Sequence, residues 1–112
     1  MERPVLGLTE KIKLLGVKQE EVMARIDSGA TASSVDINLA QRLNLGPVTR
    51  KKIVKSASGV KERPMVEAEV KINNITIRAE FTLADRDHMT YPVLIGQNIL
   101  KKGKFLIDPL KK

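Results

Sequence analysis

Apolar and polar residues alternate with a period of two along much of the chain, the pattern of β-strands with one buried face. The alternation is cleanest at 61–72 and 75–84, and Asn73-Asn74 between them is a hairpin signal. Pro64 marks a strand start or a sheet edge. The other segments expected as strands are shorter: 4–17 (broken near Thr9-Glu10), 20–27, 32–36, 48–57, 93–95 and 105–108.

Two segments have helical character instead. Residues 36–46 space their apolar side chains as an amphipathic helix does, with Asp36 expected as the N-cap. Gly46 is expected to end this helix, and Pro47 prevents its continuation. Residues 96–103 predict a second short helix. Short strands, frequent turns and one or two short helices predict an all-β fold, a small closed barrel or a sandwich.

Composition limits the class of protein. The 112 residues suggest a single domain, 1–112, and 42% apolar with 29% charged residues is an ordinary globular balance. Aromatic residues make up only 3%, so the core must be aliphatic. The absence of cysteine excludes a disulfide framework and thiolate metal sites. No apolar run reaches the length of a membrane span and no signal peptide is evident, which fits a cytoplasmic protein without a membrane partner.

The net charge of +7 raises the question of nucleic acid. The basic residues are scattered in small clusters at 49–55, 100–104 and 111–112, with no interleaved aromatic residues as stacking platforms. A solvating role is therefore favoured, and a basic nucleic-acid-binding barrel stays as a distant alternative. The single histidine, His88, stands with Asp85 and Asp87 in what reads as a polar loop, so no metal site is expected.

One carboxylate stands apart from the rest. Asp27 follows an apolar strand segment and precedes Ser28-Gly29, a turn signal. As a turn residue it would accept hydrogen bonds from the following backbone amides. It could also be a helix cap or a catalyst; the capping role is better filled by Asp36.

Two segments in order resemble the retropepsin-like aspartic proteases: "DSGA" (27–30), the family's catalytic turn, and "LIGQN" (94–98), which leads into the helix packed behind it. A wider resemblance, carried by "RIDSGATASSVD", "KERPMVEAEVKI", "ITIRAEFTLADRDHMTYPVLIGQNIL" and "FLIDP", is to the family labelled ATP-dependent zinc proteases. Its members have a retropepsin-like fold and often occur beside ATP-grasp ligases that add glutamate to proteins. Without a Cys/His cluster or a Gly-rich P-loop, the chain supports neither zinc nor ATP, and no cofactor is expected.

The resemblance implies a retropepsin-type barrel and assigns roles. Asp27 would be the catalytic carboxylate of an aspartic endopeptidase. The residues implied to support it are Ser28, Gly29, Ala30, Ile95 and Gly96. The residues implied to form the flap tip over the substrate are Ser56, Ala57, Ser58, Gly59 and Val60. The family more often has Thr at position 28 and Arg at position 97; Ser28 keeps the hydroxyl, whereas Gln97 lacks the charge for any ion pair that the Arg makes.

The chain supplies one such turn, and aspartic proteases hold the attacking water between two carboxylates. A dyad therefore requires two Asp27 side chains across a twofold axis, which predicts a homodimer acting on a peptide or protein substrate. The terminal segments 5–8 and 105–107 are candidates for an interchain sheet. The alternative function is a catalytically inactive retropepsin-like module that binds peptides or regulates a partner.

Overall fold

The computed structural model describes residues 2–57, 59–86 and 89–111. Its elements follow in the order β1 (Val5–Leu6), β2 (Thr9–Leu15), β3 (Gln19–Ile26), β4 (Ser33–Asp36), α1 (Ile37–Leu43), β5 (Val48–Ser56), β6 (Gly59–Ile72), β7 (Ile75–Ala84), β8 (Val93–Ile95), α2 (Gln97–Lys102) and β9 (Leu106–Ile107). No helix in these ranges is long and apolar enough to cross a membrane.

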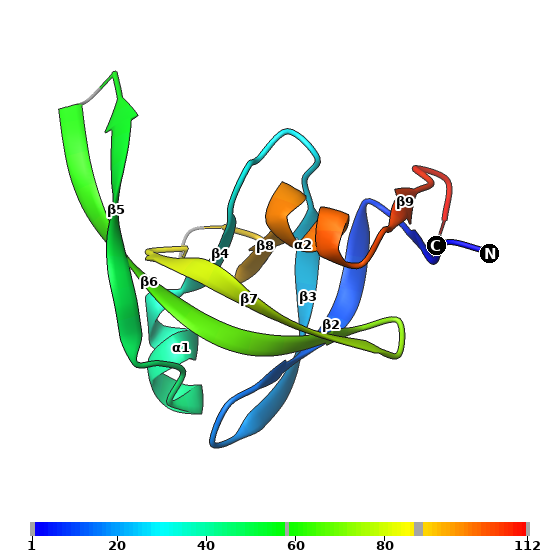
Figure 1. Ribbon diagram of the computed structural model, residues 1–112, viewed down its shortest axis with the longest axis horizontal. Coiled ribbons are helices and arrows are strands. Elements are labelled where there is room, and N and C mark those ends of the chain that lie inside the picture. Colours follow the sequence, from blue (N-terminus) through cyan, green and yellow to red (C-terminus); the bar gives the residue numbers. More distant parts are fainter. Residues whose placement is uncertain (1, 58, 87–88, 112) are drawn as a thin grey trace.

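The strands close into a barrel (Figure 1). Seven strands form a sheet in the order β2-β3-β8-β4-β7-β6-β5, and an additional pairing of β2 with β6 joins six of them into a ring. Of the seven strands of this sheet, β5 lies outside the ring, where it pairs with the outer part of the long strand β6. The expected all-β class and closed barrel are confirmed.

The period-two pattern builds the core because alternate side chains of each strand point into the barrel. On β7, Ile77, Ala79 and Phe81 are buried, as the alternation predicts. The helix α2 packs against β7, β4 and β8 and adds Ile99 and Leu100 to the core. β8 lies between β3 and β4, which explains its wholly apolar sequence.

The first predicted strand is broken at a different place. The chain does break into two strands, but the break lies at Gly7-Leu8, two residues before the expected Thr9-Glu10, and β2 begins at Thr9. Thr9 is already paired with Arg25 of β3, while the Glu10 carboxylate accepts a hydrogen bond of 2.7 Å from Gly7 N–H. The polar residues Thr9 and Glu10 are therefore part of β2. The Glu10 side chain also stabilises the segment that leads into this strand.

The end of α1 also differs from the expectation. Asp36 is the N-cap, as predicted, and its carboxylate accepts from the backbone amides of Asn38 and Leu39. The helix ends at Asn44, which is left-handed with φ 56°, and not at Gly46. Asparagine tolerates this conformation, and its N–H bonds to carbonyls of the last turn, so the helix needs no glycine there.

The two terminal segments lie beside each other next to α2 (Figure 1). β1 and β9 form a separate parallel pair, with Val5 opposite Leu106 and Leu6 opposite Ile107. Leu6 is buried in the core. Exposed side chains around this pair include the apolar Val5, Leu8, Leu106 and Leu110. The charged residues Arg3, Lys104 and Lys111 are exposed beside them. The pairing found is within one chain; an interchain sheet at these strands stays a prediction.

Candidate active site

Asp27 stands where β3 leaves the barrel. The parallel ladder between β3 and β8 extends one step beyond the strand, because Asp27 N–H donates to the Ile95 carbonyl at 2.9 Å. The Asp27 carbonyl accepts from Ala30 N–H at 3.2 Å, and its Oδ1 accepts from Gly29 N–H at 2.9 Å. One carboxylate oxygen of Asp27 therefore stabilises the turn, as expected if Asp27 acts as a turn residue. The side chain is only half-buried, so the carboxylate also remains accessible.

The turn rests directly on the start of α2. A Cβ at Gly96 would lie 2.2 Å from the Ala32 carbonyl oxygen and 2.8 Å from that of Ala30, so only glycine fits. The close approach lets Gln97 N–H donate to the Ala30 carbonyl at 2.8 Å. The sequence "GQN" is thus suited to bring a helix start against the loop that carries Asp27.

The buried side chain of Ser33 also connects β4 with the start of α2. Ser33 Oγ, on β4, accepts from Gly96 N–H at 2.9 Å and donates to Asn98 Oδ1 at 2.7 Å. Asn98 N–H in turn donates to the Thr31 carbonyl at 3.2 Å. Sequence reasoning gave no role to Ser33 or Asn98. The only signal for Ser33 is that it is a polar residue in a strand whose other side chains are mostly buried. Its hydrogen-bond partner, Asn98, is 65 residues away along the chain.

Gln97 occupies the position at which the family that the sequence resembles more often has arginine. Its Nε2 donates to the Ser28 carbonyl at 2.8 Å, across the mouth of the turn. The substitution removes a charge, but the side chain still fastens α2 to the turn through a neutral hydrogen bond. Of the residues implied to support Asp27, Ser28 and Gly29 are exposed, Ala30 is half-buried, and Ile95 and Gly96 are buried. The structure brings these residues together with Asp27.

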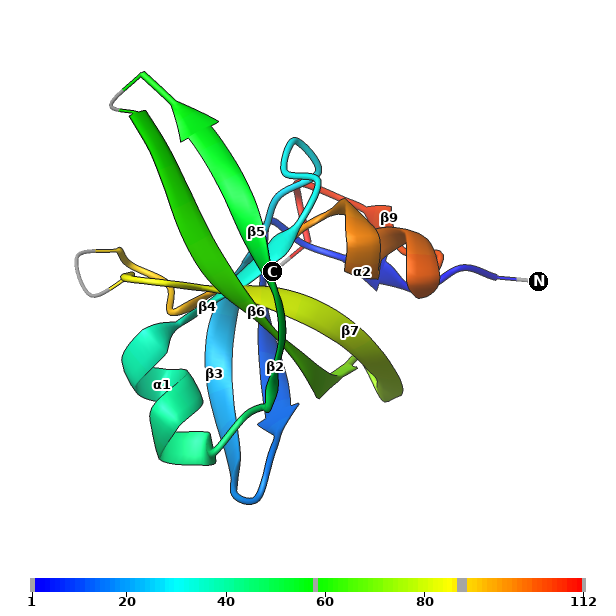
Figure 2. The same cartoon turned by 60° about the vertical axis from the view of Figure 1, so that its left-hand side comes forward.

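The hairpin implied to be the flap is present but lies apart from the turn. β5 and β6 project from the barrel, and in Figures 1 and 2 their tip is clear of the loop that holds Asp27. The last cross-strand pair joins Ser56 and Gly59, which has φ 123°; Ser58 lies outside the described residues. Val60 and Ile53 on the hairpin are 66% and 61% exposed, so apolar side chains face solvent there.

The segment before β8 is fastened by Arg86. Its backbone N–H donates to the Asp36 carboxylate at 2.9 Å, and its guanidinium donates to the Tyr91 carbonyl and to Ser34 Oγ. Burial lowers the pKa of Arg86, while the charge of Asp36 opposes this shift. Asp87 and His88, which the sequence placed in a polar loop, lie outside the described residues. In the described ranges no group of His, Cys, Asp and Glu is arranged to hold a metal ion.

Comparisons with known proteins agree with this architecture. A family model described as RimB-like, "Retropepsin-like aspartic endopeptidase RimB", matches residues 37–112. The crystal structure of protein Lpg0085 of Legionella pneumophila, of unknown function (DUF785), has a TM-score of 0.74 at 18% identity, covering 99% of this chain and 97% of its own. The solution structure of simian foamy virus (mac) protease has a TM-score of 0.64 at 17% identity, covering 83% of this chain and 91% of its own. No curated protein matches the sequence.

The two structural likenesses agree with the observed fold. The family match, which carries the retropepsin-like description, covers about two thirds of the chain, including the β5–β6 hairpin, β8 and α2. The chain belongs to the RimB-like family of retropepsin-like aspartic endopeptidases.

Proposed function

We propose that the protein is a homodimeric aspartic endopeptidase in which two copies of Asp27, one from each chain, hold the attacking water. The observation that carries the proposal is the half-buried Asp27 carboxylate on a turn fastened to both β8 and α2. Such fastening keeps a carboxylate in one place, which a reaction that depends on distances of about 3 Å requires.

The reaction needs a second carboxylate. One Asp27 accepts a proton from the water as it attacks the peptide carbonyl, while the other donates a proton to the carbonyl oxygen. Asp36 is engaged as the cap of α1, so within one chain it is not free to serve as the partner. A twofold axis beside the turn supplies the second group from an identical chain.

The position of the exposed apolar side chains supports this dimer. Val5, Leu8, Leu106 and Leu110 are 37%, 54%, 45% and 86% exposed. Leu8 lies next to the Asp27 turn, because its carbonyl accepts from the N–H of Ile26, the residue before Asp27. Val5 and Leu106 are paired across β1 and β9, and β1 ends two residues before Leu8. A gathering of exposed apolar side chains on a small protein marks an interaction surface. A second copy that covers it would also bring a second Asp27 toward the first.

The test is peptide cleavage at mildly acidic pH by wild type, Asp27→Asn and Glu21→Gln. Glu21 is an exposed carboxylate near the other end of β3, so its change controls for the loss of one negative charge. We expect Asp27→Asn to remove activity and to leave the fold intact, and Glu21→Gln to cleave as wild type does. Leu8→Glu should shift the protein to monomers in analytical ultracentrifugation and remove activity with them. A monomer with full activity would contradict the proposal.

A catalytically inactive peptide-binding module is the second candidate. It is favoured by the extent of the family match, which begins at residue 37 and so leaves out Asp27. A wild-type protein that binds a statine peptide but cleaves no substrate would establish this alternative.

A further inference from the structure

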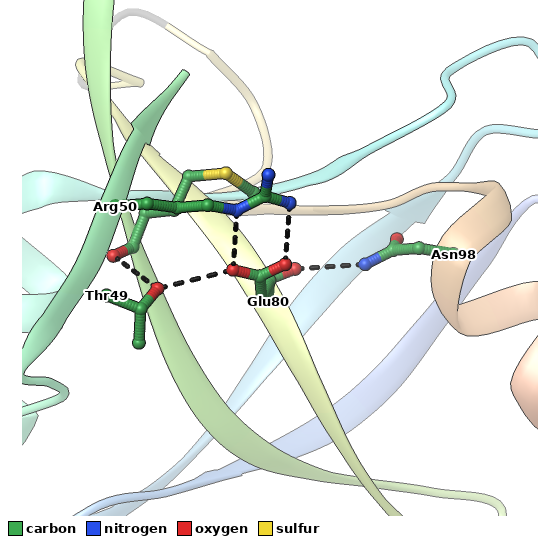
Figure 3. Close-up of polar contacts among 5 residues, drawn as sticks. Thr49, Arg50, Glu80 and Asn98 are labelled. Carbon is green, nitrogen blue, oxygen red and sulfur yellow. Dashed lines mark hydrogen bonds and ion pairs between the residues drawn. The ribbon is translucent and has the colours of Figure 1, made fainter.

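The base of the β5–β6 hairpin contains an irregularity that aims two side chains at one acceptor. The pairing register of β5 with β6 shifts between Val48 and Arg50, so Thr49 is an extra residue in β5. In a regular strand Thr49 and Arg50 would point to opposite faces of the sheet; a bulge redirects them. Figure 3 shows both side chains converging on Glu80.

The contacts are specific. Arg50 donates from Nε to Glu80 Oε2 at 3.0 Å and from a terminal nitrogen to Oε1 at 2.8 Å, a two-bond fork. Thr49 Oγ1 lies 3.2 Å from Glu80 Oε2 and 3.2 Å from the Met65 carbonyl, and its single proton serves one of them at a time. Glu80 belongs to β7, and β6 runs between β5 and β7. The fork therefore fastens the outlying strand to the barrel across an intervening strand.

The Arg50–Glu80 ion pair is suited to fixing the direction of the β5–β6 hairpin rather than to stabilising the fold. Its side chains are 65% and 32% exposed, and exposed ion pairs contribute little to the free energy of unfolding. The hydrogen bond from Arg50 lowers the pKa of Glu80, and the same bond raises the pKa of Arg50. A two-bond fork between planar groups allows one relative orientation, which a single bond does not.

Glu80 also contacts the support of the catalytic turn. Its backbone carbonyl accepts from Asn98 Nδ2 at 3.0 Å, on the side away from Arg50 (Figure 3). Asn98 Oδ1 in turn accepts from Ser33 Oγ, which holds Gly96 N–H. One residue of β7 thus meets the hairpin through its side chain and the Asp27 support through its main chain.

We propose that Arg50 and Glu80 are positioning residues that set the direction of the β5–β6 hairpin relative to the Asp27 turn, and so its readiness to close on a peptide. The two residues, with Thr49, are called the hairpin anchor below. The effect on catalysis rests on the proposed function, but the restraint on the hairpin does not. A hairpin held near one direction loses less freedom when a peptide binds, so the anchor lowers KM rather than raising kcat.

The test uses Arg50→Met, Glu80→Gln, the double variant and Arg78→Met. Arg78 is a matched control because it is 63% exposed and pairs with Glu67 across β6 and β7. Glu67 lies just beyond the part of β6 that pairs with β5, so this ion pair does not reach β5. Amide hydrogen exchange at the cross-strand pairs of β5 and β6 should accelerate roughly twofold to fivefold in each anchor variant. The double variant should be no faster than either single variant, because both changes break one interaction. Arg78→Met should exchange as wild type does.

Peptide cleavage adds a second measurement. The anchor variants should raise KM by roughly the same twofold to fivefold and leave kcat within about twofold of wild type. Hairpin exchange equal to wild type in both single variants, or accelerated equally by Arg78→Met, would overturn the anchor. If the wild-type protein cleaves no peptide, the proposed function fails while the exchange experiment still decides whether the anchor exists.

Discussion

Gly96→Ala probes the closest contact behind the Asp27 turn. The added methyl group would lie 2.2 Å from the Ala32 carbonyl oxygen, whereas a carbon normally stays about 3.3 Å or more from such an oxygen. Both groups near the new atom are main chain, so no change of rotamer relieves the overlap. The helix and the turn must separate by roughly 1 Å.

The magnitude follows from what that separation breaks. Overpacking at a tight site costs about 1–3 kcal/mol. The bonds from Gln97 N–H to the Ala30 carbonyl and from Gly96 N–H to Ser33 Oγ would stretch, at about 0.5–1.5 kcal/mol each. The lower chain entropy of alanine in the unfolded state offsets about 0.4–1 kcal/mol. The expected loss is about 2–5 kcal/mol of the free energy of unfolding.

The assay is urea unfolding at one fixed protein concentration, because the stability of a dimer depends on concentration. Gly29→Ala is the control: it makes the same chemical change on the exposed side of the same turn, where the new Cβ would lie 3.2 Å from the Asp27 Oδ1. It should change the free energy of unfolding by less than about 1 kcal/mol. If Gly96→Ala unfolds within 1 kcal/mol of wild type and still binds a statine peptide, the close packing is not what holds Asp27 in place.

Three further expectations concern the support of the Asp27 turn and the hairpin anchor. Ser33→Ala leaves Gly96 N–H buried without its acceptor and should cost about 1–3 kcal/mol in urea unfolding; an unchanged midpoint would contradict this. Gln97→Leu removes the bond to the Ser28 carbonyl at a partly exposed site. It should lower kcat/KM several-fold while unfolding changes by less than about 1 kcal/mol; equal losses of both would mean a purely structural role. The lowered pKa of Glu80 means that its contribution is full above its ordinary value of 4.5 and is lost as the pH falls further. Hairpin exchange, corrected for its intrinsic pH dependence, should therefore accelerate below pH 4.5 in wild type and not in Glu80→Gln.

Local patterns predicted the strands well. The segments 75–84 and 93–95 coincide with β7 and β8, because strict alternation and a short apolar run leave little freedom in their placement. The position of Asp27 and Gly96 in one place could be expected only through the resemblance to a known family. The alternation of apolar and polar residues does not show that β3 and β8 are neighbours in the sheet.

Contacts between distant polar residues could not be predicted. Ser33 and Asn98 stand 65 positions apart, and each looks like an ordinary polar residue in its own segment. The extra residue Thr49 is also invisible, since the alternation of β5 is weak and the bulge depends on the pairing with β6. Helix α1 ends at Asn44 and not at Gly46. Both residue types suit a helix terminus, and only the three-dimensional geometry decides between them.

The closure of the barrel leaves β5 at the open end of the sheet, with a consequence for aggregation. An unpaired strand edge is a template to which the edge of another molecule can add. The exposed residues Arg50, Lys51 and Lys55 on β5 repel an identical edge, and Pro64 on the outer part of β6 offers no N–H. The basic residues at 49–55 therefore disfavour the joining of separate molecules hairpin to hairpin. The proposed dimer uses the other surface, at the terminal strands, and so leaves this edge free of a second copy.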